Sequence, residues 1–154
     1  MTTRDLMLRQ WEYTIEETDW HPPLAEAVGG LTAAQAAWKP APERHSIWQI
    51  VRHITHWKQS VLDRWQGGSP DSDGLNAADW KEVSGDQTAW EADVRRLLDV
   101  SRQIREKFAE WSDEEFTRPP ATSTKPKVFT VMDLFCHDAY HTGQIRYLRA
   151  LQGL

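Results

Sequence analysis

The sequence predicts an all-α protein, a four-helix bundle with up-down-down-up topology. Apolar residues recur at helical spacing in four long segments, and capping boxes precede several of the helical segments. The connection over residues 66–87 could cross the bundle in extended form, so that the helices on either side of it can lie parallel. A chain of 154 residues suits a single domain, 1–154, with a core of its own.

The N-terminal part is expected to hold one long helix and two short ones. The long helix is expected over about 3–17, and Pro22 and Pro23 follow it because proline cannot continue a helix. The short helices are expected over about 22–28 and from Thr32 to Pro40.

Three further long helices are expected, each opened by a Ser or Thr cap. Their expected spans are 47–66 after Ser46, 88–111 from Thr88, and 130–151 from Thr130. A short helical turn at 112–115 and a proline-rich loop at 117–128 are expected between the last two.

Composition excludes several classes of partner. The formal net charge of -5 and the absence of a Lys/Arg cluster argue against nucleic acid and anionic membranes. No apolar run is long enough to span a bilayer and no signal peptide begins the chain, so a soluble protein is expected. The single cysteine, Cys136, suits the reducing cytoplasm. Some of the nine tryptophans are expected to line a pocket.

Two histidines of the last expected helix carry the strongest functional signal. His137 and His141 are four residues apart, on a stripe that Leu134, Ile145 and Leu148 continue. Imidazole nitrogen is a preferred ligand of Zn, Ni, Cu and Fe, so two such histidines form half of a metal site. The alternative is a pair that only makes hydrogen bonds within the core.

The second long helix offers a third ligand. His53 lies at the edge of its apolar face, whereas His56 is expected to be solvated or to support the site from outside. Three neutral imidazoles leave a coordination position open, which is typical of a catalytic metal, here Zn or Ni.

These motifs resemble those of the DinB/YfiT-like superfamily. The resemblance rests on His53 within Gln49–Ile54 and on His137-x-x-x-His141-x-Gly143-Gln144-Ile145, with support from Trp38-Lys39-Pro40 and Trp20-His21-Pro22. It extends from about Trp20 to Leu151. It implies the up-down-down-up bundle, a divalent metal held by the three histidines, and often a homodimer.

The resemblance also implies a range of activities. Proteins similar to this family include S-transferases that use bacillithiol and a mycothiol-dependent maleylpyruvate isomerase. We therefore expect a metal-dependent transferase that joins a low-molecular-weight thiol to an electrophilic small molecule. The alternative is a non-enzymatic, metal-dependent small-ligand-binding or stress-response protein.

Two other chemistries are weaker. His137-Asp138-x-x-His141 resembles the zinc-protease motif His-Glu-x-x-His, but Asp is shorter than the Glu that acts there as general base, so a metal-dependent hydrolase is a minor alternative. Cys136 is expected to be a buried small hydrophobe rather than a nucleophile.

Four further residues are candidates for supporting roles. Trp48 and Trp57 are expected to line a substrate pocket, because both belong to the helix of His53, although each could simply pack the core. Gln144 and Asp138 are the candidates nearest in sequence to accept hydrogen bonds from the metal-binding imidazoles and fix their orientation, although each could simply be a polar residue of its helix.

Overall fold

The computed structural model describes residues 1–121 and 123–154. Helices are the only regular secondary structure of these residues, which confirms the predicted all-α class. The described part of the chain contains eight helices, four long and four short: α1 (Thr3–Ile15), α2 (Leu24–Val28), α3 (Ala33–Ala37), α4 (Ile47–Trp65), α5 (Ser72–Ala78), α6 (Gln87–Ala109), α7 (Asp113–Thr117) and α8 (Lys127–Leu151).

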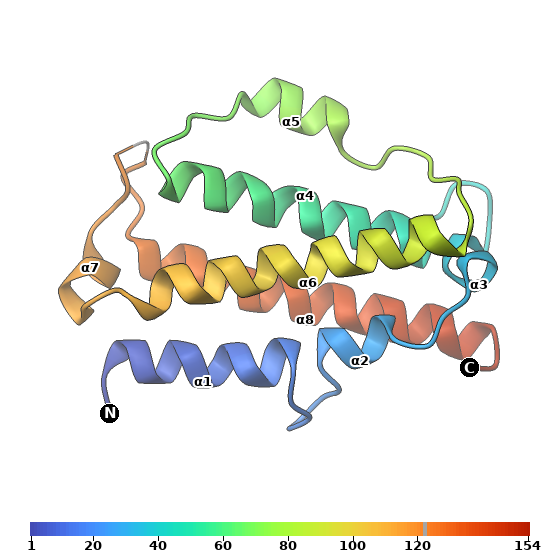
Figure 1. Ribbon diagram of the computed structural model, residues 1–154, viewed down its shortest axis with the longest axis horizontal. Helices are drawn as coiled ribbons and strands as arrows, with labels where there is room; N and C mark the ends of the chain where they lie inside the picture. The colour runs from blue at the N-terminus through green and yellow to red at the C-terminus, as the bar shows by residue number, and fades with distance from the viewer. Residues whose placement is uncertain (122) are drawn as a thin grey trace.

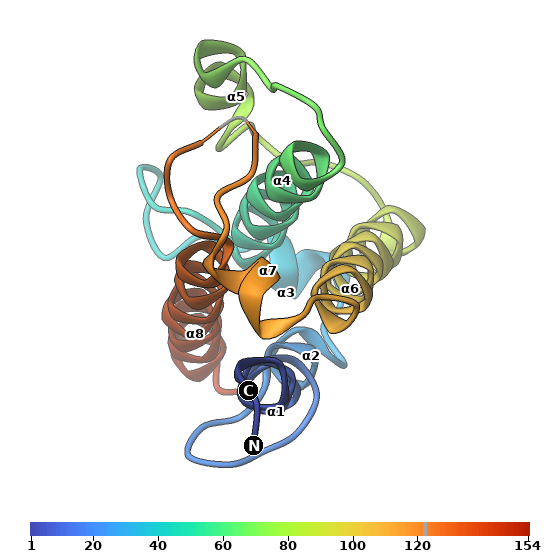
Figure 2. The same ribbon diagram turned by 90° about the vertical axis from the view of Figure 1, so that its left-hand side faces the viewer.

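The four long helices α1, α4, α6 and α8 lie side by side around a common core (Figures 1 and 2). Figure 1 shows α4 and α6 running in one direction and α1 and α8 in the other. Helix α4 packs against both α6 and α8, so side chains from α4 and α8 can meet between these two helices.

Two predicted helix starts agree with the structure and two do not. Thr32 and Ser46 are the N-caps of α3 and α4, and each forms a complete capping box. Helix α6 instead begins one residue before Thr88, because the side chain of Asp86 accepts the hydrogen bond from the N–H of Ala89. Thr130 lies inside α8, which begins at Lys127.

The proline-rich segment after α7 was expected as a loop over 117–128. Residues 118–121 and 123–126 are non-helical, whereas α7 extends to Thr117 and α8 already includes Lys127 and Val128. Residue 122 lies outside the described residues.

The long connection after α4 contains a helix that the sequence analysis missed. Helix α5 begins at Ser72, where the carboxylate of Asp71 accepts hydrogen bonds from the N–H groups of Asp73 and Gly74. Figure 1 shows α5 outside α4, on the path that carries the chain back along the bundle. This return path brings residues 79 and 80 to the face of α4 that holds His53.

The core is rich in aromatic side chains. Trp11, Trp48, Phe108 and Phe116 are completely buried, and Trp90 nearly so. Within the described residues, no helix is both long enough and apolar enough to cross a membrane.

Candidate metal centre

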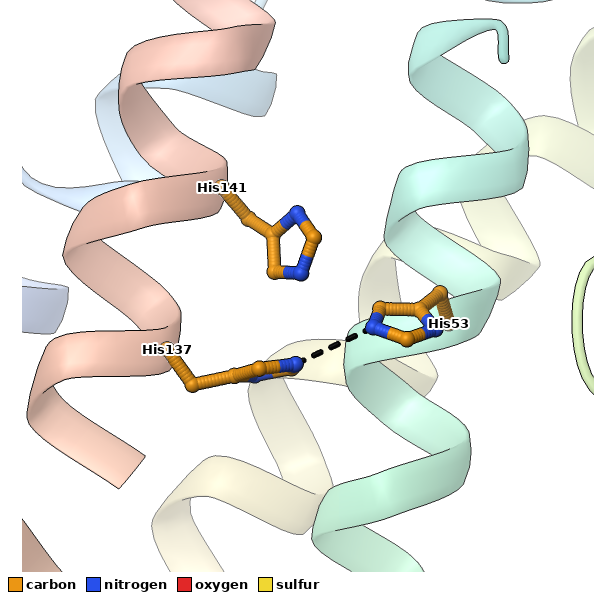
Figure 3. A group of neighbouring side chains, drawn as sticks. All are labelled: His53, His137 and His141. Carbon is orange, nitrogen blue, oxygen red and sulfur yellow. Dashed lines mark hydrogen bonds between the residues drawn. The ribbon is translucent and has the colours of Figure 1, made fainter. Parts of the chain in front are cut away.

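Three histidines from two helices converge, as the sequence analysis predicted. His53 comes from α4, and His137 and His141 come from α8 (Figure 3). One ring nitrogen from each lies within 4.8 Å of the corresponding nitrogen of the other two. The Nε2 atoms of His53 and His137 are 3.0 Å apart. Ligands about 2.0–2.1 Å from a tetrahedral metal lie about 3.3 Å from one another, so the spacing suits a shared ion.

Hydrogen bonds on the outer side of the cluster fix two of the imidazole tautomers. Nδ1 of His53 lies 2.8 and 2.9 Å from the two carboxylate oxygens of Asp79, and Nδ1 of His141 lies 2.7 Å from Oε1 of Gln144. Both partners are acceptors, so each Nδ1 carries the proton and donates it. The Nε2 atoms of His53 and His141 are therefore unprotonated, and each has a lone pair with which it could bind a metal ion. This donor set fits a divalent metal ion.

The electrostatics of the cluster also favour neutral imidazoles. Burial, together with the nearby imidazoles of His141 and His53, lowers the pKa of His137 to about 4. Burial also lowers the pKa of His141 to about 4, although the hydrogen bond to Gln144 opposes this shift. Burial likewise lowers the pKa of His53, against the opposing effect of Asp79. Neutral imidazole is the form that binds metal ions.

Asp79, which precedes Trp80 at the end of the α5 segment, links three groups of the site. Besides the bond from His53, its carboxylate accepts hydrogen bonds from Nε1 of Trp57 at 2.8 Å and from the N–H of Trp80 at 2.9 Å. Burial raises the pKa of Asp79, but the hydrogen bonds from His53 and Trp57 outweigh this effect and lower it overall. The residue therefore stays ionised and holds the His53 ring in place.

Trp80 forms one wall of the site. Its ring stacks on the imidazole of His53, with centroids 4.0 Å apart, and on that of His45, with centroids 3.8 Å apart. Trp80 has φ = 54°, a left-handed conformation that is rare for a bulky residue. Such strain is typical of functional sites, where the surrounding contacts hold it in place.

Sequence reasoning missed Asp79 and Trp80. Both lie in the connection over residues 66–87, which was expected only to cross the bundle. The periodicity of apolar residues does not indicate which residues of this connection contact His53. The one available signal was the pair itself, an acidic residue followed by an aromatic one within a long polar connection.

The other predicted site residues divide into two groups. Gln144 lies beside His141, and Trp57 lies in the wall of a cavity that His137 also lines. Trp48 does not line this cavity. It is completely buried between α4 and α6, packs edge-on against Trp90, and donates a hydrogen bond to Asp93.

The prediction for Asp138 was wrong. It is completely buried and forms an ion pair with Lys58 of α4, with Nζ and Oδ2 2.7 Å apart. It lies one residue from His137, about 100° further round the helix, so its side chain points into the core.

Two other expectations have different outcomes. Cys136 is exposed rather than buried. His56 lies outside the cluster of three, as expected, and its Nε2 donates to the backbone oxygen of Leu75 at 3.0 Å.

Two cavities border the histidine cluster. The larger, about 670 Å³, lies beside His137 between α4 and α8, and Trp57 and Trp65 form part of its wall. The smaller, about 590 Å³, lies beside His53 and is lined in part by Asp79 and Trp80. Both volumes suit a small molecule.

Comparison with known proteins identifies the family and the fold. The family model described as the DinB superfamily matches residues 18–145. The chain belongs to the DinB superfamily. It also resembles the crystal structure of a DinB-like protein from Bacillus cereus, with a TM-score of 0.68 and 18% sequence identity over 97% of this chain and 93% of that one. No curated protein matches the chain. At this identity the structural likeness establishes the fold alone, so the chemistry must be argued from the site.

Proposed function

We propose that this DinB-superfamily protein binds one divalent metal ion, Zn or Ni, through His53, His137 and His141, and catalyses transfer of a low-molecular-weight thiol to an electrophilic small molecule. The observation that carries the proposal is the convergence of three imidazole nitrogens within 4.8 Å beside a cavity of about 670 Å³. In this proposal the four long helices act as an up-down-down-up bundle that holds the ligands of α4 and α8 at a fixed separation.

The protein's own residues would prepare the site for this reaction. A divalent ion bound there would supply Lewis acidity, which favours the deprotonated and reactive form of a thiol. Asp79 and Gln144 hold the His53 and His141 rings with their Nε2 lone pairs free. Trp57 offers an aromatic surface on which the electrophile can pack.

Two alternatives remain for comparison. A non-enzymatic binding protein would use the same metal and cavity without turnover, and the tryptophan-lined wall supports ligand binding in either case. A metal-dependent hydrolase would need Asp138 as its general base. That carboxylate is completely buried against Lys58, which argues against the hydrolase.

The test is turnover of a fluorogenic electrophile. The protein is stripped of metal, reloaded with Zn²⁺ or Ni²⁺, and mixed with monochlorobimane and each of a panel of bacterial thiols. A transferase accelerates conjugation with at least one thiol, and the rate falls to background after chelation or in His141→Ala. His56→Ala, which leaves the cluster of three intact, should retain the rate. Retention of apolar ligands with no acceleration by any thiol would favour the binding protein.

We also propose that the protein is a homodimer in the cytoplasm. Several large apolar side chains of α8 are exposed at helical spacing, namely Phe129, Met132, Tyr140, Tyr147 and Leu151. Together with the exposed Cys136 they form a stripe along most of this helix, and a second copy of the chain could cover it. An exposed free thiol also suits a reducing compartment.

Light scattering tests the dimer. The mass should be twice that of the chain at micromolar concentration, and the double substitution Met132→Glu and Tyr147→Glu should yield monomers. Leu6→Glu, at an exposed apolar position on α1, is the control and should leave the dimer intact. A monomeric wild-type protein would remove the proposal.

A further inference from the structure

The larger cavity extends away from the histidines along the groove between α4 and α8. His137 lies at one end, and Trp57 and Trp65 of α4 lie along its side. Arg64 also lines it, next to the hydroxyl group of Ser60. The proposed reaction uses the histidines and Trp57, which leaves the part of this cavity around Arg64 without a role.

Arg64 is half-buried, and its charge is not neutralised within the described structure. Its guanidinium has one hydrogen-bond partner there, Oγ of Ser60 at 3.5 Å, and no carboxylate of the described residues lies within 4.0 Å of it. The other cation of the cavity wall, Lys125, forms an ion pair with Asp133, which lines the same cavity. Arg64 is therefore the cation that this cavity can offer to an anionic ligand.

Helix geometry gives the separation between this cation and the histidines. The Arg64 side chain runs back toward Ser60, which is seven residues beyond His53 on α4. At 1.5 Å per residue, the guanidinium lies about 10 Å along the helix axis from His53. The intervening wall is formed by Trp57 and Val61.

We propose that Arg64 binds the carboxylate of an elongated substrate whose thiol reaches the three histidines. An apolar stem of about six carbon atoms would span the gap and pack against Trp57, and the carboxylate would form charge-assisted hydrogen bonds with the guanidinium. This inference rests on the proposed function, because it assigns the substrate class of the same site: a thiol with a remote carboxylate. It makes Arg64 a specificity-determining residue.

The test compares mercaptohexanoate with mercaptohexanol, which have the same stem and differ in charge. Titration calorimetry on the zinc-loaded protein should show that the acid binds about tenfold more tightly than the alcohol. Mercaptoacetate is too short to reach Arg64 from the histidines, so its affinity should not depend on Arg64. Equal affinities for the hexanoate and the hexanol would overturn the proposal.

Substitutions locate the effect. Arg64→Met should remove the preference for the acid and leave the affinity for the alcohol unchanged, while Arg64→Lys should keep part of the preference. Arg52→Met is the matched control, because Arg52 lies on the same helix but already pairs with Asp93 at 2.6 Å; it should keep the full preference. Loss of the preference in Arg52→Met, or its retention in Arg64→Met, would show that the anion binds elsewhere.

Calorimetric titrations of the metal-free protein with mercaptohexanoate and mercaptohexanol, compared with those of the zinc-loaded protein, separate this inference from the proposed function. If the histidines bind no zinc, the proposed function fails, but a preference for hexanoate over hexanol that depends on Arg64 still supports the anionic subsite. If zinc binds and thiols are conjugated without any effect of Arg64→Met on the acid preference, the subsite fails and the proposed function stands.

Discussion

Two polar clusters lie between α4 and α8, and they differ in exposure and charge. The first consists of His53, His137 and His141, and it borders cavities on two sides. The second is the ion pair of Lys58 and Asp138, both completely buried. The side chains come from the same two helices, and His137 and Asp138 are adjacent in the sequence.

Burial acts on both clusters but has opposite consequences for function. It keeps the imidazoles of the first neutral, beside open space. In the second it lowers the pKa of Lys58 and raises that of Asp138, while the attraction between the two charges opposes both shifts. Nζ of Lys58 also donates to Oγ of Ser101 at 2.7 Å. The second cluster is a completely buried ion pair, and the comparison indicates a ligand site beside a structural ion pair.

The largest expected difference between the clusters is in metal binding. His137→Ala removes one of three ligands and should reduce bound metal from about one ion per chain to near zero, measured by elemental analysis after dialysis against zinc. The free energy of unfolding of the metal-free protein should change little, because the His137 ring borders a cavity. Lys58→Met is the matching variant in the second cluster. It leaves the three histidines in place and should still bind one metal ion per chain at a temperature at which the variant is folded. Equal metal loss in the two variants would contradict the division into ligand site and ion pair.

The second prediction concerns stability. Lys58→Met leaves the Asp138 carboxylate buried without its cation, so the metal-free protein should lose about 3–5 kcal/mol in free energy of unfolding. Adding Asp138→Leu removes the unpaired charge and should recover most of the loss. Urea denaturation of Lys58→Met, Asp138→Leu and the double variant measures this. Losses that simply add would show that Lys58 and Asp138 are not energetically coupled.

The two clusters also show what sequence reasoning could reach. His137, His141 and Gln144 were predictable because spacings of three and four residues on one helix are set by local geometry. The inward position of His53 followed from the apolar face of its own helix. These are properties of single helices, and the structure retains them.

Partners from distant segments were not predictable in this way. Lys58 and Asp138 are 80 positions apart in the sequence, and nothing in either helix alone indicates that they pair. The prediction that Asp138 contacts the imidazoles failed because a step of one residue along a helix rotates the side chain by about 100°. Asp79 reaches His53 only through the return path of α5. The start predicted at Thr88 failed because Asp86 caps the helix two residues earlier. The start predicted at Thr130 failed because α8 already begins at Lys127, directly after Pro126.

The third prediction concerns Asp79, the residue that the sequence did not reveal. Asp79→Asn keeps the size of the side chain but removes the charge that orients His53, so zinc affinity should fall about 10–100-fold. Competition with a chromophoric chelator measures it. Asp93→Asn is the matched control: Asp93 also accepts a hydrogen bond from a tryptophan of α4, Trp48, but it contacts none of the three histidines. A similar fall in both variants would show that the loss comes from disturbance of α4 rather than from His53.

The smallest expected effect is at Gln144, the outer partner of His141. Its Oε1 accepts a hydrogen bond from Nδ1–H of His141 at 2.7 Å, and its Nε2 donates one to the hydroxyl group of Tyr140 at 3.0 Å. A neutral hydrogen bond contributes about 0.5–1.5 kcal/mol, so Gln144→Leu should weaken zinc binding by up to about tenfold, less than Asp79→Asn. Gln144→Glu should strengthen it, because a carboxylate acceptor raises the basicity of the ligand imidazole.

Tyr140→Phe is the control for Gln144. It removes only the hydroxyl group at the exposed end of this chain of hydrogen bonds and should leave zinc affinity nearly unchanged. The chelator competition used for Asp79 resolves these differences on one scale. If Gln144→Leu lowers zinc affinity as much as Asp79→Asn does, the negative charge of Asp79 gives His53 no advantage over His141, whose partner Gln144 is neutral. Equal losses would also show that the contacts of Asp79 with Trp57 and Trp80, which Gln144 does not share, add nothing to zinc affinity.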